Sequence, residues 1–171
     1  LFPNVEAFQH TTNQSDIFEY HSEPINAKNV PENLKGLRTM FLSFHHFQPK
    51  NAKMILQNAI NSNQPIAVLE IQDRSLPSIV AMLLSPVSVL FTTPFIRPFR
   101  WSRLFFTYLI PIVPFVVLWD GIVSALRTYT VEEMRNLINS LENNTAFEWN
   151  FNKKKSKTGF VIYTIGIPKK Q

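Results

Sequence analysis

Three side chains could transfer protons or position a substrate. His45 follows the largely apolar stretch 37–44, and Glu70 comes directly after a second apolar run at 66–69. Asp120 is the one charged residue in a long apolar segment between Arg103 and Arg127. A histidine and a carboxylate at the carboxyl ends of strands suit acid–base chemistry, because ligands of open α/β sheets bind at that edge. An acid in an apolar segment is costly unless it is paired or functional. His45, Glu70 and Asp120 are therefore candidate catalytic residues.

Each candidate also has a structural interpretation. One imidazole of His45 and His46 could pack in the core, Glu70 could belong to a surface ion pair, and Asp120 could form a salt bridge with Arg127 or with an arginine of the segment 97–103. A metal site is not expected, because adjacent strand residues point to opposite faces and the chain has neither Cys nor an H-x-x-x-H spacing. One of the two imidazoles is therefore left as a candidate acid, base or hydrogen-bond donor.

The elements that would position these residues form a βαβ unit. Residues 37–47 predict a buried strand that ends in a polar corner, and 66–70 predict a second strand. Between them, Pro49 suits a first helical turn, and one apolar helix face follows it: Ala52, Ile55, Leu56, Ala59 and Ile60. Two strands joined through a helix imply a parallel sheet, so both strand ends meet at one edge.

More elements follow near both ends of the chain. The capping-box pair Thr130 and Glu133 predicts a helix over 131–141. Alternation predicts a terminal antiparallel strand pair at 147–151 and 160–165. The lysines between these strands are expected in a solvated hairpin loop: Lys153, Lys154, Lys155 and Lys157. Toward the other end, 5–8 suggest a short helix, and the alternating residues 17–20 predict a brief strand.

Composition limits the class of protein. The 171 residues suit a single domain over 1–171, 45% of them are hydrophobic, and no Cys is available for disulfides or nucleophilic catalysis. The first residues lack a signal-peptide pattern, so a processed or truncated start and a cytoplasmic location are expected. The net charge of +5 comes without a recognised nucleic-acid motif, so nucleic acid is not an expected partner. The oligomeric state stays open.

An apolar insertion is expected at 75–126. Both of its halves are long enough to cross a bilayer, but several prolines interrupt them. The basic and aromatic residues of its middle suit a membrane interface or an apolar substrate: Arg97, Arg100, Trp101, Arg103 and Tyr108. Three arrangements stay open, namely interfacial or re-entrant helices at the inner face of the membrane, a helical hairpin through the bilayer, and a buried insertion in a soluble protein.

The stretches 38–47, 97–103 and 120–129, in this order of elements, resemble the C-terminal two-thirds of bacterial class I S-adenosylmethionine-dependent methyltransferases. The resemblance implies an α/β fold: a partial doubly wound (Rossmann-like) methyltransferase sheet with a terminal antiparallel strand pair and an apolar helical insertion. It also implies S-adenosyl-L-methionine as cofactor and a small-molecule methyl acceptor that is apolar or membrane-associated.

On this resemblance, Asn26 and Ala27 belong to the loop that holds the adenine edge, and Ser43, Phe44 and His45 line the methionine and adenine side of the cofactor. The glycine-rich loop of the family is not in this sequence. The chain is therefore expected to be a truncated methyltransferase-like domain that does not bind the cofactor usefully alone. The competing hypothesis is a non-enzymatic, membrane-associated binding module in which 75–126 is the working part.

Overall fold

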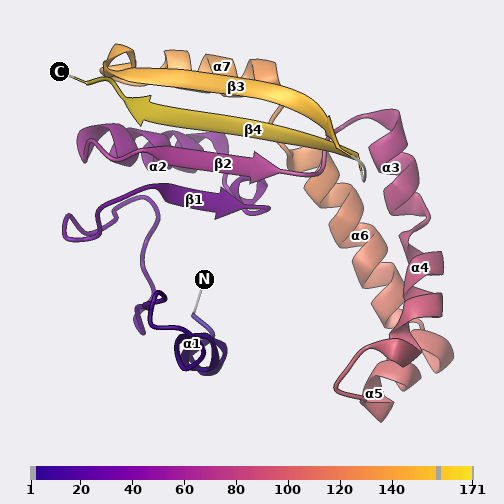
Figure 1. Ribbon diagram of the computed structural model, residues 1–171. Helices are drawn as coiled ribbons and strands as arrows, with labels where there is room; N and C mark the ends of the chain where they lie inside the picture. Colours follow the sequence, from indigo (N-terminus) through magenta and orange to yellow (C-terminus); the bar gives the residue numbers. More distant parts are fainter. Residues whose placement is uncertain (1–2, 157–158, 171) are drawn as a thin grey trace.

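The computed structural model describes residues 3–156 and 159–170. Its centre is a mixed four-stranded sheet in the order β1-β2-β4-β3 (Figure 1), formed by Arg38–Phe41, Ile66–Glu70, Gly159–Pro168 and Phe147–Ser156 respectively. β1 and β2 are parallel, whereas β4 is antiparallel to both of its neighbours, β2 and β3. The protein is therefore α/β, with the predicted βαβ unit and terminal antiparallel pair.

Helix α2, Pro49–Asn61, makes the crossover between β1 and β2 and begins with Pro49 in its first turn. This position suits proline, because an N–H there would have no partner within the helix. All five apolar positions predicted for one face of α2 are buried. The helix holds the pairing of Arg38 with Ile66 through Phe41 with Leu69, so the carboxyl ends of β1 and β2 lie together.

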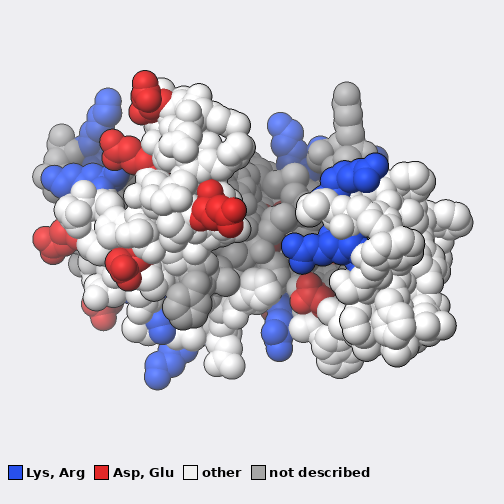
Figure 2. Space-filling view, turned by 90° about the horizontal axis from the view of Figure 1, so that it is seen from below, with Lys and Arg blue, Asp and Glu red and all other residues white. Residues whose placement is uncertain are grey.

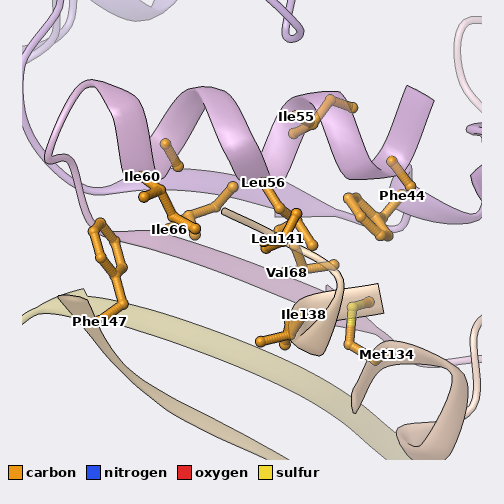
Figure 3. Close-up of a cluster of buried hydrophobic side chains, with 12 residues drawn as sticks. Phe44, Ile55, Leu56, Ile60, Ile66, Val68, Met134, Ile138, Leu141 and Phe147 are labelled. Atoms are coloured by element: carbon orange, nitrogen blue, oxygen red, sulfur yellow. The ribbon is translucent and has the colours of Figure 1, made fainter. Parts of the chain in front are cut away.

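Helix α7, Val131–Asn139, packs beside α2 on the same face of the sheet (Figures 1 and 3). Its predicted capping box is present, since the Thr130 hydroxyl accepts from the Glu133 N–H and the Glu133 carboxylate accepts from the Thr130 N–H. The core between helices and sheet includes Leu56, Ile66, Val68, Met134, Ile138 and Phe147. Each such buried side chain contributes about 1.5–3 kcal/mol to folding.

The opposite face of the sheet is more open. Phe41 and Ile167 on that face are 62% and 53% exposed. Within the described ranges, no helix covers it (Figure 1). A doubly wound sheet carries helices on both faces, whereas the described residues place helices on one face of this sheet only.

Residues 76–127 form a helical arm that projects from the sheet (Figure 1). It comprises α3 (Leu76–Leu83), α4 (Ser85–Thr92), a 3-10 turn η2 (Thr93–Phe95), α5 (Trp101–Leu104), a π-helical turn η3 (Phe105–Leu109) and α6 (Ile112–Arg127). α3 and α4 pack along α6. The arm covers nearly all of the insertion that the sequence places at 75–126.

Asp73 connects the start of the arm to the sheet. Its carboxylate is buried and accepts from the Ser75 N–H at 3.1 Å, from the Ser75 and Ser78 hydroxyls, and from the Lys153 ammonium of β3. Burial alone would raise the pKa of Asp73, but the bonds from Lys153, Ser75 and Ser78 outweigh it and hold the pKa well below its ordinary value. The start of α3 is thereby tied to the end of the sheet.

Three local predictions are wrong. Residues 17–20 form no strand, and they follow α1 (Val5–Thr12), which has no buried side chain and lies apart from the sheet (Figure 1). The strand expected over 37–47 covers only Arg38–Phe41. Lys153 to Lys155 extend β3 instead of forming a loop, because β4 pairs with them; Lys157 lies outside the described residues.

Candidate functional site

The corner after β1 is made by an unusual backbone. Leu42 has a φ of 50°, in the left-handed region, which costs a non-glycine residue roughly 1–2 kcal/mol. Its N–H still donates to the Leu69 carbonyl of β2, at 3.0 Å. The chain then turns at once into a 3-10 helix, η1, Phe44–His46. This turn aims the N–H groups of Phe44 and His45 back at β2.

Glu70 receives those N–H groups. It is the next residue after Ile66 and Val68 on the covered face of β2, and it is only 4% exposed. One carboxylate oxygen, Oε1, accepts from the N–H of Phe44 at 2.8 Å and of His45 at 3.2 Å. The other, Oε2, lies 2.9 Å from Nδ1 of the His45 ring. Glu70 is therefore the cap of η1 and the partner of His45, instead of a member of a surface ion pair.

The contact with Glu70 determines what the His45 ring can do. A carboxylate is an acceptor, so in the neutral ring Nδ1 carries the proton and Nε2 presents its lone pair. In the described part of the chain, no hydrogen bond uses Nε2. His45 also lines a cavity, so the geometry is that of a general base oriented by a carboxylate.

The cavity beside His45 has a volume of about 310 Å³, and we call it the dyad cavity after the His45–Glu70 pair. Its lining comes from η1, the start of α2, the two segments where the arm begins and ends, and the start of α7: His45, His46, Phe47, Gln48, Pro49, Arg74, Arg127, Tyr129 and Glu133. It lies at the carboxyl end of β1 and β2, where the sequence predicts a binding site.

The charges of the dyad cavity are partly paired. Arg74 donates to Glu133 at 2.8 Å, and the other oxygen of Glu133 caps α7. Burial tends to raise the pKa of Glu133, but the Thr130 N–H and Arg74 outweigh it and lower that pKa. Tyr129 donates its hydroxyl proton to the Phe47 carbonyl at 2.7 Å, and its pKa is raised by burial and by Glu133. Arg127 adds a positive charge at the rim.

A second cavity, of about 360 Å³, lies on the other side of Phe47, and we call it the loop cavity. It is lined by Pro24, Ile25, Asn26, Ala27, Met40, Ser43 and Phe47. Three of the expected cofactor contacts thus meet in one place: Asn26, Ala27 and Ser43. The side-chain oxygen of Asn26 accepts from the Lys28 N–H at 3.1 Å, which leaves its amide donors for a ligand.

The other two expected cofactor contacts lie elsewhere. Phe44 is fully buried in the core between α2 and α7. His45 faces the dyad cavity. The reason is the 3-10 turn, which removes residues 44–46 from the strand alternation assumed from the sequence. For the same reason the His45 and His46 rings lie side by side, with centroids 4.2 Å apart, instead of on opposite faces.

The candidates from the insertion are all on the arm. Arg97, Arg100, Trp101 and Arg103 lie at its far end near α5 (Figure 1), and the Tyr108 hydroxyl donates to the Leu90 carbonyl of α4. Asp120 is exposed on α6, and no described residue forms an ion pair with it, including Arg127. The structure thus joins His45 with Glu70 but places Asp120 apart from them.

Tyr129 and Glu133 were not identified from the sequence as cavity residues. Their signal is positional. Tyr129 links the arm to α7, Glu133 lies in the first turn of α7, and this helix, which packs beside α2, begins at the edge where β1 and β2 end. Among the described residues, no group of three or more potential metal ligands gathers at this edge or elsewhere.

A larger cavity adjoins the loop cavity, with which it shares Pro24 and Ile25. Its volume is about 670 Å³, and α1 and the loop after it form its walls, between Pro3 and Ile25. It contains no candidate site residue. The candidate site therefore consists of the two smaller cavities at the strand ends.

The chain matches no protein-family model, no curated protein and no solved structure. Within the described ranges, no single helix is long and apolar enough to cross a membrane. Two bent pairs reach that length and composition jointly: Leu76–Leu83 with Ser85–Phe95, bent by 41°, and Trp101–Leu109 with Ile112–Arg127, bent by 79°.

Proposed function

We propose that this chain is the acceptor-selecting, C-terminal part of a class I S-adenosylmethionine-dependent methyltransferase, and that it methylates a small apolar or membrane-associated acceptor. The strand order supports the proposal, since a reversed last strand follows a parallel βαβ pair in the way that the resemblance implies. The dyad cavity lies at the carboxyl ends of β1 and β2, and the loop cavity lies beside the carboxyl end of β1, which supports it further.

The loop cavity is the candidate cofactor wall. It offers the donors of the Asn26 amide, the hydroxyl of Ser43 and the apolar side chain of Met40, which suit a heterocycle edge beside an apolar surface. These residues fit one side of S-adenosylmethionine. The cofactor would supply a methyl group already activated by a positively charged sulfur, so the protein has to align the acceptor and remove its proton.

The observation that carries the proposal is the His45–Glu70 contact at the dyad cavity. The lone pair of Nε2 would take the proton from an acceptor O–H or N–H, and the cofactor would supply the methyl group that replaces this proton. The buried carboxylate 2.9 Å from Nδ1 stabilises the imidazolium that results. Phe47 lines both cavities, so acceptor and cofactor would meet beside its side chain.

The test is transfer of a radioactive methyl group from labelled S-adenosylmethionine into a lipid extract by the full-length gene product, counted in the organic phase. We expect His45→Ala to lower the rate by about 100-fold or more, which is the usual loss for a general base. His10→Ala is the matched control, because His10 is exposed on α1. Equal rates for both variants would remove His45 from the chemistry.

The second candidate function, a non-enzymatic membrane-binding module, is favoured by the arm, which exposes large apolar side chains. Calorimetric titration with S-adenosylhomocysteine separates the two candidates when it is done on the full-length gene product. Binding supports the methyltransferase, whereas vesicle binding without any heat of cofactor binding supports the module.

A further inference from the structure

The arm has its apolar side chains on the outside. Among the described residues of the arm, the buried ones are small or polar: Thr93, Thr107, Pro114, Gly121, Ser124 and Ala125. Its large apolar residues face outward, and six of them are at least 72% exposed: Leu76, Phe91, Phe95, Trp101, Leu109 and Trp119. A segment folded for water buries such side chains. The arm is therefore built for an apolar surrounding.

Small residues at the helix contacts agree with this. A Cβ added to Gly121 of α6 would lie 2.7 Å from Sδ of Met82 in α3, so the Met82 side chain occupies the space that a side chain at position 121 would take. Close approach through small residues is typical of helices packed in lipid, where apolar burial gives little drive for association.

The outward face of α6 shows how the arm would lie. Phe115, Trp119 and Leu126 are spaced by four and seven residues and form one exposed apolar stripe. Asp120 and Arg127, seven residues apart, run along the border of that stripe and are exposed as well. An apolar stripe with a charged border suits a helix lying in the plane of a membrane interface.

Spanning fits less well. The 16 residues of α6 extend roughly 24 Å, short of the roughly 30 Å hydrocarbon core of a bilayer, and the chain bends by 79° before α6 begins. A spanning α6 would also carry the exposed Asp120 into hydrocarbon, which is expensive.

The far end of the arm offers charges to a lipid surface. Arg103 donates to the Ile96 and Pro98 carbonyls, at 2.9 and 3.3 Å, and so holds the turn. Arg97 and Arg100 make no ion pair or side-chain hydrogen bond with any described residue. Between and beside them, the Phe99 and Trp101 rings pack edge to face at 5.2 Å. Basic and aromatic side chains together are typical of the headgroup region of anionic membranes.

We infer that the arm inserts in the plane of one leaflet of an anionic bilayer, with the α6 stripe among the upper acyl chains and with Arg97 and Arg100 at lipid phosphates. Figure 2 agrees, because the lobe formed by the arm is mostly uncharged, with a few basic residues. The inference names the surface at which the proposed acceptor would be met. It does not depend on methyl transfer, and its test needs neither cofactor nor acceptor.

Brominated lipids test the inserted face. Three single-tryptophan variants retain Trp101, Trp119 or Trp149, the last of which lies in the sheet and donates to the Asn144 carbonyl. On anionic vesicles we expect quenching of Trp101 and Trp119, stronger for bromine near the carbonyl end of the acyl chain than near its methyl end, and none of Trp149. Stronger quenching of Trp119 by bromine at the methyl end would overturn in-plane insertion.

Equal quenching of all three tryptophans would overturn the inference as a whole. The same holds if the chain does not bind the vesicles and instead forms a dimer or binds another protein. If a variant does not fold, Trp119→Cys with an environment-sensitive label gives the same depth information. The chain has no other Cys to label.

Charge variants test the lipid class. Arg97→Gln with Arg100→Gln should weaken partitioning onto anionic vesicles about 25-fold, since each basic residue at such a surface contributes roughly five-fold. Lys169→Gln with Lys170→Gln removes the same charge at the C-terminal end, far from the arm (Figure 1), and should change it little. Equal losses for the two pairs would indicate general charge attraction and overturn a specific contact by the tip of the arm.

Discussion

Replacing Glu70 tests whether one buried carboxylate organises the candidate site. Glu70→Ala removes the acceptor for three donors at once, namely the N–H groups of Phe44 and His45 and Nδ1 of His45. Glu70→Gln keeps an amide oxygen for the two N–H groups but turns an NH₂ donor toward the imidazole. The two variants therefore separate the loss of the cap from the loss of the charge.

The magnitude follows from counting these bonds. Each buried donor left without a partner costs about 1–3 kcal/mol, so Glu70→Ala should lower the free energy of unfolding by about 3–9 kcal/mol. Glu70→Gln should lower it by about 1–2 kcal/mol, because neutral bonds replace charge-assisted ones. Since many domains have only about 5–15 kcal/mol in total, the Ala variant could unfold outright, and the Gln variant provides the measurable case.

Urea unfolding followed by far-UV circular dichroism measures both variants. Glu148→Ala is the control, because Glu148 is exposed on β3 and should change the free energy of unfolding by less than about 0.5 kcal/mol. Nitrogen NMR of His45 gives an independent readout, with the proton on Nδ1 in the native chain and on Nε2 in Glu70→Gln. Equal stabilities for the Ala variants of Glu70 and Glu148 would refute the capping role.

Two other predictions concern the scaffold. The pKa of Asp73 is lowered in the folded state, so its contribution to stability is present above its ordinary value of about 4 and is lost as pH falls below it; Asp73→Asn should flatten the acid limb of a Tm-against-pH curve. Gly166→Ala should cost about 1–3 kcal/mol by thermal unfolding, because a Cβ there would lie 2.4 Å from the rigid indole of Trp149. Gly121→Ala should be near neutral, because its close neighbour is the flexible Met82 side chain and alanine favours the helix; an equal loss at both glycines would contradict this reasoning.

The elements that periodicity and caps specify were predictable from the sequence. The helix after Pro49 and the helix after Thr130 begin at the predicted residues, because each start is encoded by local groups that act within one turn. β2 was also predicted, since a short apolar run bounded by polar residues suits a buried strand.

The site itself was predictable only in part. The sequence indicated which strand ends meet, and therefore that His45 and Glu70 would be close. It did not reveal the left-handed Leu42, because nothing in the residue type marks that conformation, and the predicted strand therefore extends through Phe47. Without that turn, Phe44 was assigned to a cofactor and not to the core.

The arm and the dyad cavity are adjacent, because the chain enters and leaves the arm at the cavity. Three residues separate Glu70 from Arg74, and α6 ends at Arg127, where the buried Thr128 donates to the Ser124 carbonyl at 2.9 Å. Both arginines line the cavity, and α6 contacts η1. A molecule lying against the outward stripe of α6 is therefore already beside the wall that holds His45. An apolar surface and a base oriented by a carboxylate, placed side by side in this way, suit an acceptor that is taken from a membrane.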